Sequence, residues 1–253
     1  MLTSCNRVQQ KYFNRFEIKY QISMITRDIL IRQIQPFMEL DSHVTNNRHY
    51  EIRSVYFDSP FKKSFLDKVN GIKIRIKLRI RYYPDFQNGE KELVFIELKK
   101  KINENVSKNR VLAPFEDAFK IIDNHTPEAK SFYKNGSKED QSNLEEIWYL
   151  YNRYHLQPIC VVCYKRQPYM DKIQNRFRIT FDTNLKVRNY NFDLHYGNGN
   201  RYIVPPNISI MEVKFNSFIP NWAINLLQRN NILQQKMSKF ASGLERDLIF
   251  SIV

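Results

Sequence analysis

The stretch Lys73-Ile74-Arg75-Ile76-Lys77-Leu78-Arg79-Ile80-Arg81 alternates a cation with an aliphatic residue at every position. Because side chains along a strand point alternately to its two faces, a strand here carries five cations on one face and four aliphatic residues on the other. Neighbouring cations on the same face lie ~6.6–6.8 Å apart and repel one another. An ordinary solvated face usually mixes both signs, so the row predicts a bound polyanion, with a plain exposed surface as the alternative.

Other segments repeat this alternation with carboxylates mixed among the cations. They are Arg15-Phe16-Glu17-Ile18-Lys19, Phe95-Ile96-Glu97-Leu98-Lys99-Lys100-Lys101, Tyr164-Lys165-Arg166, Arg176-Phe177-Arg178-Ile179-Thr180-Phe181-Asp182 and Ile210-Met211-Glu212-Val213-Lys214. In a sandwich the charged faces would all point outward, whereas a wide barrel would keep them inside. We expect an α+β fold, with an antiparallel sheet closed into a β-barrel and helices packed on the outside.

Further strands and helices are expected between these segments. Further strands are expected at 50–58, 158–167, 201–204 and 208–215. Helices are expected at 23–40, 61–70, 220–228 and 238–250. The less regular block 113–153 predicts two or three helices. We therefore expect a single domain over 1–253, with a helical insertion at about 113–153.

Composition limits the class of protein. The 253 residues include 40 Lys and Arg against 26 Asp and Glu, a net charge of +14 that favours a polyanionic partner. A hydrophobic fraction of 42% excludes a disordered chain. The three cysteines, Cys5, Cys160 and Cys163, are too few for a disulfide framework. Cys160 and Cys163 lie three apart in an apolar strand, so they point to opposite faces and are expected to be buried thiols, not zinc ligands.

The chain shows no apolar signal core at its start and no apolar run approaching the ~20 residues that cross a bilayer. We expect a cytoplasmic protein that reaches the inner face of a membrane only through a membrane-protein partner in trans.

Eight short motifs carry a family resemblance. They are Arg15-Phe16-Glu17-Ile18-Lys19-Tyr20, Arg53-Ser54-Val55-Tyr56-Phe57-Asp58, Lys77-Leu78-Arg79-Ile80-Arg81-Tyr82, Phe95-Ile96-Glu97-Leu98-Lys99, Tyr164-Lys165-Arg166, Arg178-Ile179-Thr180-Phe181-Asp182, Met211-Glu212-Val213-Lys214 and Ser238-Lys239-Phe240. In order and spacing they resemble the VTC-type polyphosphate polymerase domain of the triphosphate tunnel metalloenzyme (CYTH-like) superfamily, over most of the chain. The resemblance implies a closed antiparallel eight-stranded β-barrel that forms a tunnel. In the family this tunnel binds ATP or polyphosphate with Mn²⁺ or Mg²⁺ and transfers the terminal phosphate of ATP onto polyphosphate, releasing ADP.

The resemblance and the charge pattern together assign candidate residues. The candidate catalytic residues are Arg79, Arg81, Lys99 and Lys239. The candidate phosphate-binding residues are Lys19, Arg75, Lys77, Lys108, Arg166, Arg178 and Lys214. Glu212 is implied to hold the metal, because hard cations prefer oxygen ligands. Glu17 and Glu97 are further metal candidates, with salt bridges to neighbouring cations as the alternative. Lys108 lies in a loop-like stretch, where a solvated surface position is the alternative.

Two positions depart from the superfamily. The hydrolases carry Glu-x-Glu-x-Lys in their first strand, whereas Arg15 replaces the first Glu here, as in VTC-type domains. Losing one carboxylate weakens metal-assisted activation of water and favours transfer to a phosphate acceptor over hydrolysis. The second departure is Phe240, because Tyr is usual after the Ser-Lys pair.

Three functions compete. The first is a polyphosphate polymerase that uses ATP, inorganic phosphate and polyphosphate; the second is a triphosphatase or polyphosphatase on the same fold; the third is a non-catalytic module for polyphosphate or another polyanion such as RNA. A nucleic-acid reader should interleave exposed aromatic residues with its cations. The residues between the cations of 73–81 are Ile and Leu, so no nucleic-acid partner is expected.

Overall fold

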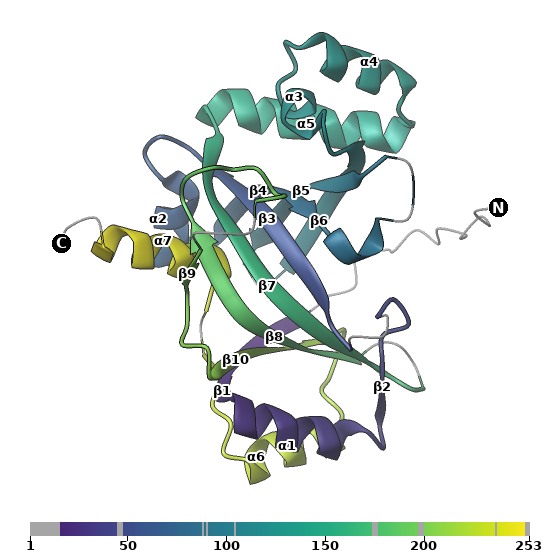
Figure 1. Ribbon diagram of the computed structural model, residues 1–253, viewed down its shortest axis with the longest axis vertical. Coiled ribbons are helices and arrows are strands. Elements are labelled where there is room, and N and C mark those ends of the chain that lie inside the picture. Colours follow the sequence, from purple (N-terminus) through teal and green to yellow (C-terminus); the bar gives the residue numbers. More distant parts are fainter. Residues whose placement is uncertain are drawn as a thin grey trace.

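A computed structural model describes residues 16–44, 48–87, 89, 91–103, 105–173, 177–196, 200–235 and 237–250, with only the backbone described for 247–250. Within these residues, ten strands form one antiparallel sheet, and helices lie against it (Figure 1). Arg15, Arg176 and Cys5, which the sequence singled out, lie outside the described residues.

The sheet follows the order β1-β10-β8-β7-β3-β4-β5-β6, with β2 paired to β7 and β9 paired to β8. The strands are β1 (Phe16–Ser23), β2 (Met38–Leu40), β3 (Tyr50–Asp58), β4 (Ile74–Tyr82), β5 (Leu93–Ile102), β6 (Asn105–Pro114), β7 (Gln157–Asp171), β8 (Phe177–Arg188), β9 (Arg201–Tyr202) and β10 (Ile208–Phe215). Four of the five cations of the predicted row therefore lie on β4, between β3 and β5, and Lys73 directly precedes the strand.

The expected closed barrel is wrong, because the sheet remains open. Among the described residues, β1 and β6 are the two ends of the strand order and do not pair with each other. The physical reason lies at the free edge of β1, where the chain between the last two helices runs alongside it. The Gln235 amide donates to the Lys19 carbonyl at 2.9 Å, and Tyr20 bridges Gln234. Backbone groups bonded in this way are not available to β6.

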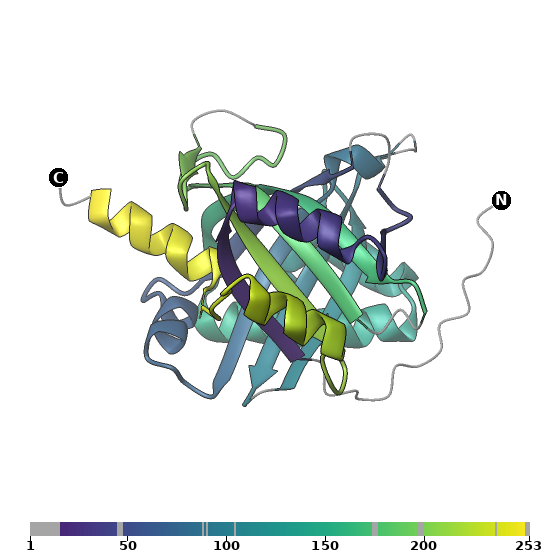
Figure 2. The same ribbon diagram turned by 90° about the horizontal axis from the view of Figure 1, so that it is seen from below.

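The open sheet nevertheless curls until its charged face surrounds an interior. Lys99 on β5 approaches Glu17 on β1, with 3.4 Å between Nζ and Oε2. Five strands separate β1 from β5 in the sheet order, so only strong curvature brings these side chains together. In Figure 2, β1 and β10 lie in front of β4, β5 and β6.

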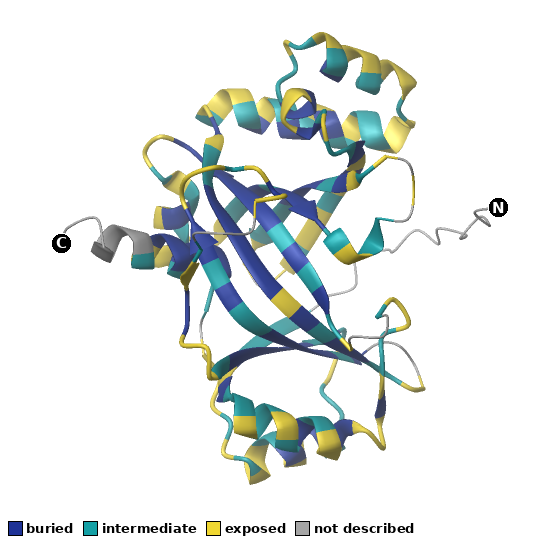
Figure 3. Ribbon diagram, viewed as in Figure 1, coloured by how far each residue is buried: buried dark blue, intermediate teal, exposed yellow. Residues whose placement is uncertain are grey.

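The outer, apolar faces of the strands are covered by helices. Helices α3 (Ala118–Ile122), α4 (Pro127–Asn135) and α5 (Lys138–Tyr154) contribute to one apolar core with β4 and β5, in which Leu78 and Ile80 are buried (Figure 3). Helices α1 (Met24–Ile34) and α6 (Asn221–Arg229) pack in the same way against β1, β8 and β10. The alternation in β4 therefore separates the apolar core from the charged interior, as predicted.

A third apolar core joins α2 (Lys63–Val69) and α7 (Lys239–Phe250) to the sheet. It contains Phe65, Phe240 and Leu244 packed with Tyr56 and Val187. Helix α7 thereby holds its first residue, Lys239, against the charged interior, where that side chain is buried.

The sequence pattern misplaced two elements. The helix expected over 23–40 ends at Ile34, and the chain then forms β2. The block that precedes the insertion was expected to be loop-like, yet residues 105–114 form the edge strand β6. An edge strand pairs with a single other strand, so its alternation of apolar and polar residues is weak. Such a strand is harder to predict from the sequence.

The thiol prediction is confirmed for the pair that the structure describes. Cys160 and Cys163 are buried in different apolar cores, on opposite faces of β7. No helix within the described residues is long and apolar enough to span a bilayer.

Candidate functional site

A first group of charges, here called the Glu97 cluster, consists of Glu97, Arg79, Arg81 and Lys108. Arg79 Nη2 lies 2.6 Å from Glu97 Oε2, and Lys108 Nζ lies 3.0 Å from Oε1. Arg81 Nε lies 3.6 Å from the same carboxylate. Burial by itself would raise the pKa of Glu97, which is 1% exposed, but Arg81, Arg79 and Lys108 hold it well below its ordinary value. The carboxylate is therefore ionised and fixes the direction of the cations around it.

A second group, here called the Glu212 cluster, surrounds Glu212 on β10. Its other members are Lys19, Arg166, Asp182, Lys214 and Lys239. Glu212 lies 2.6 Å from Lys239 Nζ, 2.8 Å from Lys214 Nζ and 3.0 Å from Arg166 Nη2. Burial would raise the pKa of Glu212, but the cations around it, led by Lys214, hold it well below its ordinary value.

Asp182 completes the Glu212 cluster from β8. Arg166 donates to both of its oxygens, at 2.7 Å each, and Lys239 Nζ lies 2.6 Å from Oδ2. This fork-shaped contact orients the Arg166 guanidinium, so that Nη2 also reaches Glu212. Asp182 is a positioning residue that the candidate set omitted. Its place two residues after Thr180 and four after Arg178, on one face of the strand, was the available signal.

Glu17 on β1 joins the two sides of the interior. It lies 3.1 Å from Lys19 Nζ and 3.4 Å from Lys99 Nζ. The salt-bridge alternative for Glu17 and Glu97 thus describes their contacts in this structure.

Cations outnumber carboxylates on this face. The ion pairs above join eight cations to four carboxylates. Lys77 is a further cation on this face. Its Nζ donates to the Ser238 hydroxyl at 2.9 Å. Burial, together with Lys19 and Lys99, lowers the pKa of Lys77 to about 7. Such crowded positive charge favours binding of a multivalent anion.

Four buried polar atoms on the same face lack a hydrogen-bond partner within the described part of the chain. They are Arg81 Nε, Arg178 Nε, Ser54 Oγ and Thr180 Oγ1. Ser54 pairs with Arg81 across the ladder and Thr180 with Glu212, so both hydroxyls face the interior. Buried donors are normally satisfied, and these suit an oxygen-rich ligand.

Two predicted residues lie apart from the clusters. Arg75 donates to the Ile72 carbonyl at the start of β4. Arg178 contacts Asp41 at 3.2 Å and the Tyr50 hydroxyl at 3.5 Å. Lys108, by contrast, lies on β6 and not in a loop, and it reaches Glu97.

Tyrosines that the sequence left out of the site also line it. Tyr164 lies under both Lys239 Nζ, at 4.8 Å from the ring centre, and the Arg166 guanidinium, at 5.3 Å. The Tyr56 hydroxyl accepts from Arg79 at 3.1 Å. Phe240, the departure from the usual Tyr, packs on Tyr56 with 5.1 Å between ring centres. Tyr56 and Ser238 therefore supply hydroxyls where residue 240 has none.

The carboxylates of the site suit a divalent ion only where phosphate oxygens supply further ligands. Within the described residues no group of three or more His, Cys, Asp or Glu side chains could hold a metal. Mg²⁺ in nucleotide sites is commonly held by one or two carboxylates and by phosphate oxygens. Glu212 and Glu17, which both contact Lys19, match this smaller set.

Comparisons with known proteins place the chain in a family. Among solved structures, it is similar to a candidate adenylate cyclase from Bacillus halodurans, with 14% identity, a TM-score of 0.47, and coverage of 88% of this chain and 93% of that one. A protein from Pyrococcus horikoshii gives 12% identity, a TM-score of 0.45, and coverage of 92% and 99%. A third structure is a candidate adenylyl cyclase from Hippeastrum, described as having a dominant triphosphatase activity. It gives 16% identity, a TM-score of 0.42, and coverage of 91% of this chain and 95% of that one. At such identities and TM-scores these likenesses carry no argument about function.

No curated protein matches the chain. The family model described as "VTC domain" matches residues 14–246, which include every member of both charge clusters. The chain therefore belongs to the VTC domain family.

Proposed function

We propose that this chain is a phosphotransferase that moves the terminal phosphate of ATP onto polyphosphate along its charged interior. Membership of the VTC domain family supports a function in polyphosphate or triphosphate chemistry. The observation that carries the proposal is the surplus of cations over carboxylates in the two clusters, together with the unpartnered buried donors beside them.

Phosphoryl transfer depends on positioning and charge stabilisation more than on covalent help from the protein. Arg79, Arg81 and Arg166 would clamp phosphate oxygens, and their carboxylate partners hold the three guanidiniums in place. Arg75 and Lys77 would contact phosphates farther along the polyphosphate chain, and Arg178, which contacts Tyr50, would contact phosphate toward the other end of the charged face.

Lys19, Lys99 and Lys239 would neutralise charge on the transferred group. An oxygen of the acceptor phosphate attacks the γ-phosphorus of ATP, and the bond to the β,γ-bridging oxygen breaks, so that ADP leaves with the electron pair. Acceptor oxygens are anionic, so the step needs no general base. Lys108 and Lys214 would add to the phosphate contacts.

Glu212 and Glu17 would hold Mn²⁺ or Mg²⁺, with Glu97 as a further candidate. A divalent ion supplies additional positive charge to the phosphate oxygens. Glu97 contacts three cations of its own cluster, so its proposed role is mainly to orient them.

The test is incubation of the purified protein with ATP and Mn²⁺, followed by gel analysis of the products. Long phosphate chains support the proposal. Free phosphate alone would identify a triphosphatase, and unchanged ATP with tight polyphosphate binding would identify a binding module. Either of these results contradicts the proposal.

Arg79→Ala and Arg81→Ala should each weaken tripolyphosphate binding about 10- to 100-fold, because each removes charged hydrogen bonds worth about 1.5–3 kcal/mol. Isothermal titration calorimetry measures this loss. The matched control is Lys100→Ala, since Lys100 lies on β5 but contacts Glu146 of α5 on the outer face, at 2.6 Å. Full retention of binding by both Arg variants, or an equal loss in the control, would refute the clamp.

A further inference from the structure

The charged face ends in aromatic side chains. The pattern of β4 continues from Arg81 to Tyr83, and the pattern of β5 begins two residues before Glu97, at Phe95. Arg81 pairs with Phe95 across the ladder, so both point to the interior face. Tyr50 on β3 and Phe86 join them; Tyr50, Tyr83, Phe86 and Phe95 are called the aromatic end below.

These rings form a contiguous group. The distance between ring centres is 4.9 Å for Tyr50 and Phe86, 5.7 Å for Tyr83 and Phe86, and 6.0 Å for Tyr83 and Phe95. Tyr50 is buried, whereas Tyr83, Phe86 and Phe95 are only half-buried. The group therefore presents aromatic surface to a ligand and is supported from behind by a buried ring.

The aromatic end adjoins the phosphate clamp directly. Arg81 Nη1 donates to the Tyr83 hydroxyl at 3.2 Å, while Arg81 Nε faces Glu97. The Arg110 guanidinium lies over the Phe95 ring, 5.3 Å from its centre, and Arg110 is exposed. Glu97 and Arg110 are neighbours across the β5–β6 ladder. The Arg110 guanidinium and the Phe95 ring thus form a cation–π pair beside the place where the clamp ends.

The opposite end of the same two strands differs in chemistry. There β4 and β5 carry Lys73, Arg75, Lys77, Lys99 and Lys101 at the corresponding alternate positions. The interior face accordingly changes from aromatic to basic along its length, which matches a ligand with a flat head and a polyanionic tail.

We propose that the aromatic end is a nucleobase subsite, in which the base of a nucleoside triphosphate stacks on the exposed Arg110 guanidinium, which the Phe95 ring supports, while Arg79 and Arg81 hold its phosphates. This deepens the proposed function and rests on it, because the phosphates must lie on the charged face. Base stacking on aromatic rings and arginine tolerates any base, so the subsite selects nucleotides over inorganic phosphates and does not select adenine.

The test compares two ligands on one protein by isothermal titration calorimetry. ATP and inorganic tripolyphosphate share the phosphate tail, and only ATP has the base. Phe95→Leu should weaken ATP binding about 5- to 100-fold, the range expected for one stacked base, and change tripolyphosphate binding less than twofold. Phe95→Tyr keeps the ring and should keep ATP affinity. Arg110→Gln should weaken ATP binding more than tripolyphosphate binding.

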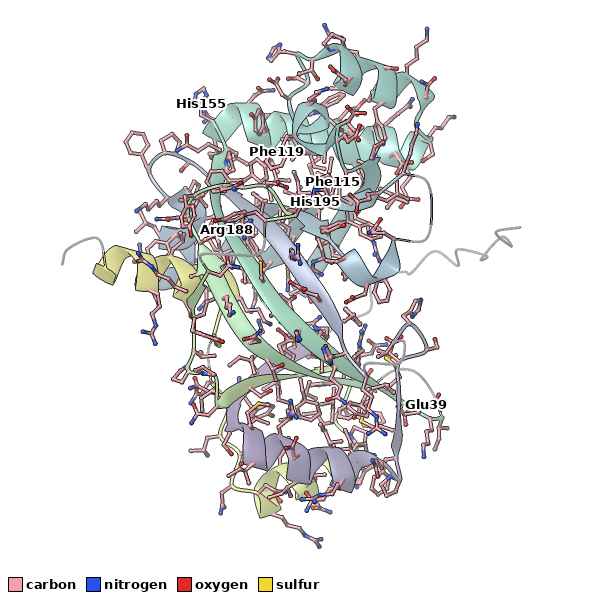
Figure 4. All side chains as sticks on the ribbon, in the orientation of Figure 1. Glu39, Phe115, Phe119, His155, Arg188 and His195 are labelled. Atoms are coloured by element: carbon pink, nitrogen blue, oxygen red, sulfur yellow. The ribbon has the colours of Figure 1, made fainter. Side chains whose placement is uncertain are left out.

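The matched control is Phe119→Leu, the same change on α3, where Phe119 packs against Phe57 on the outer side of the sheet (Figure 4). It should leave both affinities unchanged. Equal loss of both ligands in Phe95→Leu, or unchanged ATP affinity, would overturn the subsite while tripolyphosphate binding upholds the charged face. Failure of the wild-type protein to bind either ligand would overturn the proposed function as well.

Discussion

Single residues of the interior are held in place by charge rather than by packing alone. Glu212 illustrates this, since it is 4% exposed and contacts Lys19, Lys214, Lys239 and Arg166. A bare metal ion approaching this carboxylate meets four cations, so the cluster favours a metal that arrives with phosphate.

Lys77 is a residue of the interior whose charge responds to pH near neutrality. Its pKa of about 7 lies below the ordinary lysine value because of burial and the nearby Lys19, Lys99, Lys68 and Arg75. A lysine with a lowered pKa binds fewer protons in the folded state, so its contribution to the stability of the free protein rises with pH above about 7. A bound polyanion favours the protonated form, so binding takes up a proton at Lys77 above pH 7.

We therefore expect tripolyphosphate affinity to fall between pH 7 and 9, and Lys77→Met to make that fall shallower. Calorimetry in two buffers with different ionisation enthalpies measures the proton uptake directly. Identical uptake by wild type and variant would contradict the assignment to Lys77.

At the scale of elements, Asp58 connects β3 to α2. The carboxylate is buried and accepts from the amides of Ser59 and Ser64 at 2.8 Å each and from Phe65 at 3.0 Å. These contacts anchor α2 beside α7, which carries Lys239.

Asp58→Ala leaves buried amides without an acceptor and should lower the free energy of unfolding by about 1–3 kcal/mol. Denaturant unfolding measures the change. The control is Asp67→Ala on the same helix, because the pair of Asp67 with the half-exposed Lys63 contributes only about 0–1 kcal/mol. A smaller loss for Asp58 than for Asp67 would be inconsistent with this cap.

The elements also show what sequence reasoning could and could not supply. The regular alternation in β4, β5 and β10 allowed these strands and their apolar faces to be predicted correctly. Both the hydrophobic periodicity and the positions of the charged residues indicated a strand. The edge strand β6 and the aromatic end were missed. Lys108 was therefore assigned to a loop, and the pattern was followed only as far as Arg81.

At the scale of the molecule, the charge pattern indicated that the charged faces lie around an interior, but the predicted closure into a barrel was wrong. The local pattern around Gln234 and Gln235 does not indicate that these residues bind the edge of β1, because the interaction joins backbone groups distant in sequence. The chain-wide prediction of one domain over 1–253 stays a prediction.

The surplus of positive charge in the interior should make ligand binding and stability interdependent. Tripolyphosphate at 100 times its dissociation constant should raise the free energy of unfolding by about 2.7 kcal/mol. Thermal unfolding with and without the ligand measures this, and added NaCl should reduce the shift because salt screens the contacts. An equal shift from sulfate at the same ionic strength would argue against a site shaped for linked phosphates.

The Lys99–Glu17 contact marks the place where the two sides of the curled sheet meet. The two margins of the curled sheet approach each other there through side chains, not through a backbone ladder. Parting them would break this ion pair and no backbone ladder between β1 and β6 within the described residues. On the proposed function, we expect such a parting to admit a long linear polyphosphate from the side, without its end being threaded through a ring.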